Sequence, residues 1–110
     1  MERLIKGDIV VVPFPFSDLS NYKKRPALVI TKLKGDDLIL CQITSQNISD
    51  EYAITLNNED LTIGNLKRKS NIRPNRIFTA DGKIVLSKVG NLTESKMTEV
   101  INKLIVIIKS

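Results

Sequence analysis

Apolar and polar residues alternate in short blocks, a pattern that predicts a chain built mostly of strands. β-branched and other apolar residues cluster at positions 9–12, 26–32, 38–44 and 52–56, and turn-forming residues separate these clusters. Gly35-Asp36-Asp37 predicts a hairpin turn between the second and third clusters. Further extended segments are predicted at 70–79 and at 84–89. Pro13 and Pro15 are expected to end the pairing of the first strand.

The last segment has a different period, which predicts a helix. Thr93 is suited to an N-cap, and Glu94 is favourable in a first helical turn. Apolar residues then recur at helical spacing and form one face: Met97, Val100, Ile101, Leu104, Ile107 and Ile108. We expect this face to pack on the sheet, with binding of a partner as the alternative.

Five or six short antiparallel strands and a C-terminal helix indicate a mainly β fold with one helix. The 110 residues are enough for one hydrophobic core, so positions 1–110 are predicted to form a single domain. Small antiparallel sheets commonly remove their edges by curling into a barrel, and we expect that architecture here.

Charge and composition narrow the possible functions. Lys and Arg number 17 against 12 Asp and Glu, which gives a net charge of +5. This balance favours an anionic partner, above all nucleic acid, although a basic surface without such a partner is the alternative. The chain has no histidine, and its acidic residues show no metal-ligand spacing, so neither a metal nor another cofactor is expected. Cys41, the single cysteine, lies in an apolar pattern typical of inert core.

The termini indicate no membrane segment. The N-terminus lacks the long apolar region of a signal peptide, and the longest apolar run near the C-terminus, 104–108, is too short to span a bilayer. The expected compartment is therefore the cytoplasm.

Two strand ends carry the candidate chemistry. In Lys24-Arg25-Pro26, Arg25 is expected to close a polar loop, with Pro26 holding it in an extended conformation where its planar fork can face a phosphate. Thr44 and Ser45 deliver hydroxyl groups at the end of the third strand. We hypothesise that these two places meet. The alternatives are an Arg25 that only pairs with Asp18 and a Thr44 that is an ordinary strand-end residue.

Other residues could support binding of a nucleic acid. Arg73 and Arg76 are either phosphate ligands or solvated edge charges. Phe14 and Phe16 alternate, so one of them could stack on a base, whereas packing in the core or in a dimer is the alternative use. The basic run 67–69 is typical of a solvated loop, and phosphate steering is its alternative use.

Several motifs together resemble the MazF/PemK toxins of type II toxin–antitoxin systems. They are Gly7-Asp8-Ile9-Val10, Lys24-Arg25-Pro26-Ala27-Leu28-Val29, Ile43-Thr44-Ser45, Ser70-Asn71-Ile72-Arg73 and Lys88-Val89-Gly90-Asn91-Leu92-Thr93. The resemblance runs from Gly7 to about Ile108. It implies a small SH3-like antiparallel β-barrel of the CcdB/MazF type, a homodimer, and a metal-independent endoribonuclease that cuts single-stranded RNA at short sequences.

The resemblance also assigns roles to residues. It implies that Arg25 and Thr44 are the catalytic pair. The expected RNA contacts are Lys24, Phe16, Ser45, Arg73, Asn75 and Arg76. Where the family typically has Arg-Cys-Asp, this chain has Arg73-Pro74-Asn75, so the acid is replaced by an amide.

The chemistry of RNA cleavage fits these residue types. RNA carries its own nucleophile, the 2′-hydroxyl, so the protein has to orient it and neutralise charge on the phosphorane. Arg25 suits the neutralising role, and Thr44 can donate to a non-bridging oxygen. A cognate antitoxin, acidic and partly disordered, is expected to bind the same basic surface. The alternatives are a non-catalytic toxin of the same fold that binds DNA gyrase, like the CcdB group, and a plain nucleic-acid-binding barrel.

Overall fold

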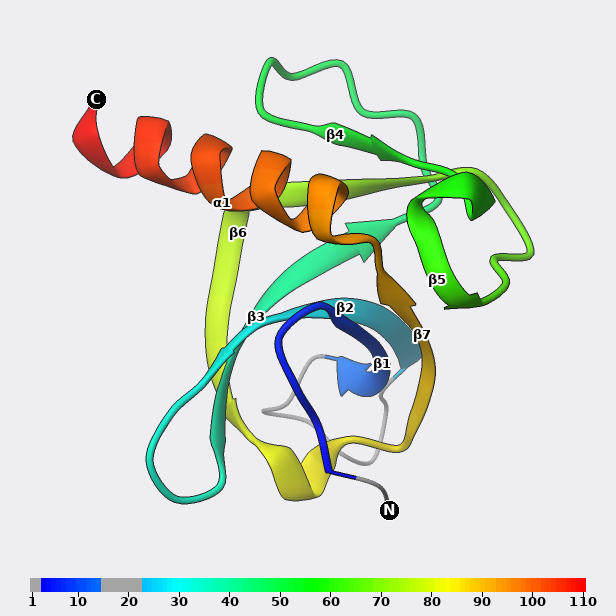
Figure 1. Cartoon of the computed structure of the whole chain (residues 1–110), viewed down its shortest axis with the longest axis vertical. Coiled ribbons are helices and arrows are strands. Elements are labelled where there is room, and N and C mark those ends of the chain that lie inside the picture. Colours follow the sequence, from blue (N-terminus) through cyan, green and yellow to red (C-terminus); the bar gives the residue numbers. More distant parts are fainter. Residues whose placement is uncertain (1–2, 15–22) are drawn as a thin grey trace.

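The chain folds as a curled antiparallel sheet with one long helix across it (Figure 1), as seen in a computed structural model that describes residues 3–14 and 23–110. The strands are β1 (Asp8–Phe14), β2 (Lys23–Lys32), β3 (Asp37–Thr44), β4 (Ile54–Leu56), β5 (Leu61–Gly64), β6 (Ser70–Asp81) and β7 (Ser87–Leu92). The helices are the 3₁₀ turns η2 (Asn58–Asp60) and η3 (Gly82–Ile84) and the helix α1 (Glu94–Lys109).

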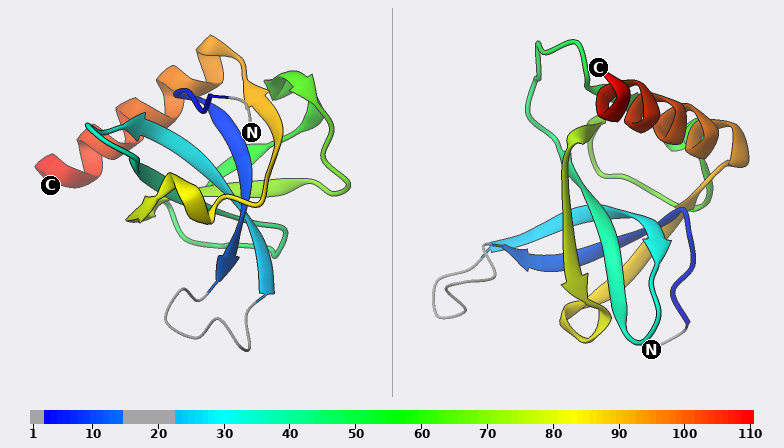
Figure 2. Two further views of the ribbon diagram at one scale, coloured as in Figure 1. Left: turned by 90° about the horizontal axis from the view of Figure 1, so that it is seen from below. Right: turned by 90° about the vertical axis from the view of Figure 1, so that its left-hand side faces the viewer.

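The strands form one sheet in the order β4-β6-β3-β2-β1-β7-β5, and all neighbours run antiparallel. The two views in Figure 2 show how this sheet curls round until its ends approach the same side of the molecule. This arrangement confirms the predicted mainly β, SH3-like barrel with a C-terminal helix. β3 lies between β2 and β6, so residues from these three strands are brought together.

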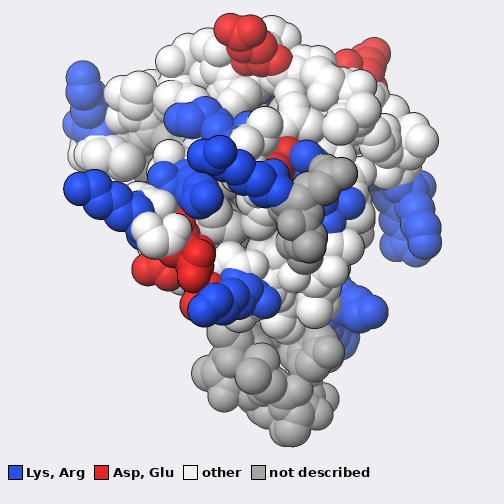
Figure 3. All heavy atoms as spheres, turned by 60° about the horizontal axis from the view of Figure 1, so that its bottom comes forward, with Lys and Arg blue, Asp and Glu red and all other residues white. Residues whose placement is uncertain are grey.

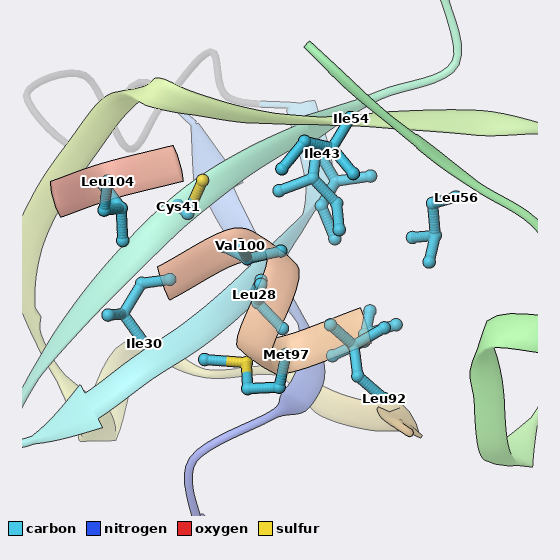
Figure 4. Packing of buried hydrophobic residues seen from close by; sticks show 12 residues of the cluster. Leu28, Ile30, Cys41, Ile43, Ile54, Leu56, Leu92, Met97, Val100 and Leu104 are labelled. Atoms are coloured by element: carbon cyan, nitrogen blue, oxygen red, sulfur yellow. The ribbon is translucent and has the colours of Figure 1, made fainter. Parts of the chain in front are cut away.

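The curl gives the sheet two apolar faces with a separate cluster on each. The first cluster lies between the sheet and α1 and includes Leu28, Cys41 and Ile43 from the strands (Figure 4). Met97, Val100 and Leu104 of α1 are buried against it. The second cluster lies on the opposite face of the sheet and includes Val12, Ala27 and Leu40.

The predicted helix is confirmed at its start, and its predicted face packs on the sheet as far as Leu104; the expected packing of Ile108 is wrong, because it lies near the end of the helix with 71% of its surface exposed. The Thr93 hydroxyl accepts a hydrogen bond from the Lys96 backbone N–H at 3.3 Å, as an N-cap should. Beyond Leu104 the apolar side chains Ile105, Val106 and Ile108 are exposed. In the part of the chain that the structure describes, no helix has the length and apolar character needed to cross a membrane.

The Gly7-Asp8 motif closes the barrel rather than forming part of a surface site. Asp8 is fully buried, and its carboxylate accepts hydrogen bonds from the Ile5 N–H and from Asn91 Nδ2, both at 2.8 Å. Lys88 Nζ lies 3.2 Å from the same carboxylate. Gly7 has φ +92°, a conformation that favours glycine. The motif therefore joins the N-terminal segment to β7.

Two predictions about the first strands are wrong. β1 pairs with β2 through Pro13 and Phe14, whereas the prolines were expected to end its pairing. The ladder between β1 and β7 ends at Val11, so Pro13 has a neighbouring strand on one side only, and its missing N–H leaves no partner unsatisfied. β2 in turn begins at Lys23, which places Arg25 within the strand and not in a loop.

Two further boundaries also differ from the prediction. The strand expected at 84–89 begins only at Ser87, because a 3₁₀ turn capped by Asp81 occupies Gly82–Ile84. It then continues through Gly90, where a Cβ would lie 2.9 Å from the Ile63 carbonyl oxygen. Gly90 has no room for a side chain because β5, a strand that the sequence did not predict, pairs closely beside β7.

Candidate active site

The strand register brings three of the predicted residues to one face at one end of the sheet. Ala27 of β2 pairs with Gln42 of β3, and Gln42 pairs with Arg73 of β6. Arg25 lies two residues before Ala27, and Thr44 lies two residues after Gln42. Because side chains in a strand alternate with a period of two, both lie on the same face as Ala27, Gln42 and Arg73. Arg25, Thr44 and Arg73 thus come from three adjacent strands.

Arg25 is exposed and sits opposite Val12 of β1. Within residues 3–14 and 23–110, no acidic side chain forms an ion pair with its guanidinium. Lys24 beside it is also exposed and faces Pro13 across the ladder. Asp18, the alternative partner of Arg25, and Phe16, a predicted RNA contact, lie outside the described residues.

Thr44 ends β3 with its hydroxyl fixed from one side. Its Oγ1 accepts a hydrogen bond from the Gln46 backbone N–H at 3.2 Å, and Thr44 pairs with Asn71 of β6. The Asn71 side chain in turn donates to the Gln46 carbonyl oxygen at 3.2 Å. Since its oxygen serves as the acceptor, the Thr44 hydroxyl can still donate its proton to a ligand. Ser45 follows in an exposed position.

Arg73 is held differently from Arg25, because it is largely buried and ion-paired. Its Nη2 lies 2.9 Å from the Asp50 carboxylate, with 15% of the Arg73 side chain and 30% of the Asp50 side chain exposed. Among the described residues, the Arg73 Nε is the one buried side-chain nitrogen or oxygen with no hydrogen-bond partner. The interpretation of Arg73 as a merely solvated edge charge is therefore wrong.

Asp50 is itself anchored by the loop that carries it. Its carboxylate accepts backbone N–H groups from Tyr52 at 3.1 Å and Ala53 at 2.9 Å. Partial desolvation tends to raise the pKa of Asp50, but the hydrogen bonds from Arg73 and from the two backbone groups outweigh it. The pKa of Asp50 therefore lies below its ordinary value, and its carboxylate stays charged near neutral pH.

A bulge in β6 presents the remaining predicted residues. Cys41 pairs with Ile77 and the next residue, Gln42, pairs with Arg73, so residues 74–76 have no partner on β3. Asn75 and Arg76 in this bulge are exposed. Bulges commonly redirect side chains beside functional sites, and this one carries an exposed amide and an exposed cation two and three residues after Arg73.

The Cys41 thiol lies behind this site and takes no part in it. Cys41 is fully buried, and its thiol donates to the Arg73 carbonyl oxygen. Burial raises the pKa of Cys41 to about 12, and the hydrogen bond to the backbone only partly offsets this effect. The predicted inert core cysteine is confirmed, since nucleophilic cysteines are thiolates with lowered pKa values.

The charges around the site suit an anionic ligand. Lys and Arg predominate on the face of the molecule seen in Figure 3. Asp50, the acid at the site, is neutralised by Arg73, whereas Arg25, Lys24 and Arg76 are exposed. Among the described residues, no cluster of three acidic or cysteine side chains could hold a metal ion.

Asp50 is the site residue that the sequence analysis missed. It lies in a polar loop 23 positions before Arg73, and nothing in the spacing of the two residues indicates that they meet. The only local signal is weak: Asp50 is a residue type that commonly forms a turn by accepting the backbone N–H two residues on.

The fold and the family are also supported by comparison with known proteins. A family model described as "PemK-like, MazF-like toxin of type II toxin-antitoxin system" matches residues 5–108. No curated protein matches the sequence closely enough to count as a relative.

Solved structures with similar folds come from toxins of such systems. A mycobacterial endoribonuclease in complex with its cognate antitoxin is 11% identical, with a TM-score of 0.77 over 97% of this chain and 96% of that one. MazF from Deinococcus radiodurans is 17% identical, with a TM-score of 0.76 over the whole of both chains. A chain of a MazE–MazF structure from the same organism is 16% identical, with a TM-score of 0.78 over 96% of each chain. Because the family model matches nearly the whole sequence, the chain belongs to the PemK-like, MazF-like toxins of type II toxin–antitoxin systems.

Proposed function

We propose that this toxin is a sequence-specific endoribonuclease that cleaves single-stranded RNA in the cytoplasm without a metal ion. The observation that carries the proposal is the placement of Arg25 and Thr44 on the same face of adjacent strands, each two residues from the paired Ala27 and Gln42, with Arg73 on the next strand. Membership of the family and similarity to solved endoribonucleases support the same activity.

The proposed reaction uses the 2′-hydroxyl of RNA as the nucleophile. The 2′-oxygen attacks the adjacent phosphorus and loses its proton to water, and the bond from phosphorus to the 5′-oxygen breaks. The leaving oxygen takes a proton from water. The products are a 2′,3′-cyclic phosphate and a 5′-hydroxyl, so no covalent intermediate with the protein forms.

The chain contributes charge and orientation to this reaction. Arg25 donates two parallel hydrogen bonds to the phosphorane oxygens, which gain negative charge in the transition state. Thr44 donates its hydroxyl proton to another non-bridging oxygen. Arg73, fixed by Asp50 at 2.9 Å, offers its remaining guanidinium N–H groups to the RNA without having to be ordered when RNA binds.

The test is incubation of the purified chain with a long single-stranded RNA in the presence of a chelator. We expect defined fragments that end in a 2′,3′-cyclic phosphate. Arg25→Ala should cleave the RNA at least about a hundredfold more slowly, whereas Lys109→Ala, which removes an exposed cation at the end of α1, should cleave like the wild type. RNA that stays intact with the wild-type chain would refute the nuclease, and fragments with a 3′-hydroxyl end would refute attack by the 2′-hydroxyl.

The cognate antitoxin is proposed to be an acidic, flexible chain that binds over the same basic surface. A disordered acidic segment can order along the exposed cations Arg25 and Arg76 and exclude phosphates from them. Arg76→Glu is the better variant for the test, because Arg76 is exposed and Arg73→Glu would also disrupt the ion pair with Asp50. Both RNA and antitoxin should bind Arg76→Glu more weakly. Unchanged antitoxin affinity combined with lost RNA binding would mean separate sites.

A further inference from the structure

A basic hollow lies beside the start of β6. It has a volume of about 300 Å³. Its lining consists of two carboxamides, one apolar residue and three consecutive cations: Asn57, Asn58, Leu66, Lys67, Arg68 and Lys69.

The three cations are not neutralised by the protein. Lys67, Arg68 and Lys69 are exposed, and within the described part of the chain none of them forms an ion pair. The nearest acid along the chain, Asp60, accepts the Asn57 N–H at 2.8 Å and lies 3.7 Å from the Lys96 ammonium group. The Asp60 carboxylate therefore interacts with Lys96 of α1 and does not neutralise the hollow, where three positive charges lie close together.

The wall of the hollow is held in place by a side chain. Asn58 Oδ1 accepts the Leu66 backbone N–H at 2.6 Å, which fixes the connection between β5 and β6 against η2. The Asn58 carboxamide nitrogen can still donate to a ligand. Ser70, the residue after the three cations, is buried and donates to the Arg68 carbonyl oxygen at 3.1 Å, so the basic segment is tied to the sheet at its end.

The sheet places this hollow close to the candidate active site. Asn71 of β6 pairs with Thr44 on one side and with Thr55 of β4 on the other, and Ser70 pairs with Leu56. Lys69 precedes Asn71 by two residues, a separation of about 6–7 Å along an extended chain. A polyanion that runs from the end of β3 along the start of β6 would therefore reach the hollow.

We propose that this hollow is a binding site for a phosphate of the single-stranded RNA that flanks the cleaved bond. The inference rests on the proposed nuclease function. Each phosphate of a single strand repeats the same charge, so a strand held at Arg25 offers further phosphates to a second group of cations. The hollow thus lengthens the RNA site from one scissile phosphate to several nucleotides, and its two carboxamides face the sugar or base beside the bound phosphate.

The test compares two triple variants of equal charge. Lys67, Arg68 and Lys69 are replaced by Ala in the hollow variant, and the exposed residues Lys6, Lys34 and Lys109 are replaced in the control. Both lose three positive charges, from +5 to +2. The probe is a 12-nucleotide single-stranded RNA with 2′-O-methyl groups, which cannot be cleaved, and its affinity is measured over a series of salt concentrations.

The hollow variant should bind this RNA at least about tenfold more weakly than the control at low salt. Its slope of log affinity against log salt should be shallower than that of the control by about 0.7, because each phosphate contact on a single strand contributes about 0.7. Equal affinities and slopes for the two variants would overturn the inference. Cleavage of unmodified RNA by the wild-type chain tests the proposed function separately. If the wild-type chain cleaves RNA but both variants bind equally, only the phosphate site in the hollow is refuted. If the variants bind differently but the wild-type chain does not cleave, only the nuclease function is refuted.

Discussion

The buried carboxylate of Asp8 should matter for stability and not for cleavage, and the structure allows its effect to be estimated. Asp8→Ala removes the acceptor of the Ile5 N–H, the Asn91 amide and the Lys88 ammonium group. Breaking a buried ion pair in this way costs about 3–5 kcal/mol. The Lys88 side chain is 21% exposed and can regain some hydration, so we expect a loss of about 3 kcal/mol.

The assay is unfolding by denaturant, followed by circular dichroism, with a matched control. Asp36 pairs with Lys83 at 3.6 Å, but the two side chains are 65% and 79% exposed. Asp36→Ala should therefore cost well under 1 kcal/mol. At about 4 °C per kcal/mol for a domain of this size, the melting temperature of Asp8→Ala should fall by roughly 12 °C.

Equal losses for the two variants would show that burial of the Asp8 carboxylate adds nothing, and the reasoning would be wrong. A second measurement separates structure from function. Asp8 begins β1, whereas Arg25 faces the other end of that strand at Val12. Below its melting temperature, Asp8→Ala should therefore cleave RNA at the wild-type rate per folded molecule.

Four further predictions concern the site and the assembly. Arg25→Ala should fold normally and lose at least about a hundredfold in cleavage, the usual cost of removing a donor to transition-state charge, as single-turnover rates would show. Thr44→Val keeps the shape but not the hydroxyl, so turnover should fall while RNA affinity changes little; a loss confined to affinity would limit Thr44 to binding. Asp50→Asn should weaken RNA binding by loosening Arg73. Because the pKa of Asp50 is lowered in the folded protein, the ion pair should stabilise the fold above about pH 4, and this stabilisation should disappear as the pH falls through the lowered pKa. Light scattering should give the mass of a dimer, because the end of α1 projects beyond the sheet with exposed apolar side chains, and a concentration-independent mass near 12.3 kDa would contradict this.

The parts of the fold that follow from local sequence were predictable. The helix carries its own start signal at Thr93 and an apolar face at helical spacing, and the start and the part of that face up to Leu104 appear as expected. β3 was predicted almost to the residue, because its alternate residues pack on two different clusters. In contrast, β5 has mostly exposed side chains, including Ile63 at 59%, so no alternation marks it as a strand.

The errors arose where a neighbouring strand decides the structure. Pro13 was expected to end pairing because it lacks an N–H, but β7 has already ended beside it. Arg25 was expected at the end of a loop because polar, turn-forming residues precede it, yet β1 extends far enough to pair with it. The Asp50–Arg73 ion pair depends on a loop returning to a strand, which no local pattern records.

A chain without histidine has to obtain its rate from position and charge, and the geometry of this site is suited to that. Arg25, Thr44 and Arg73 are carried by three hydrogen-bonded strands, so their spacing is fixed before RNA arrives. The lowered pKa of Asp50 keeps its carboxylate charged against Arg73, and the raised pKa of Cys41 keeps that thiol neutral. Neither group changes its charge near neutral pH. Under the proposed mechanism, the effect of pH on cleavage then comes mainly from the 2′-hydroxyl of the RNA, whereas the effect of salt comes from the basic surface that binds its phosphates.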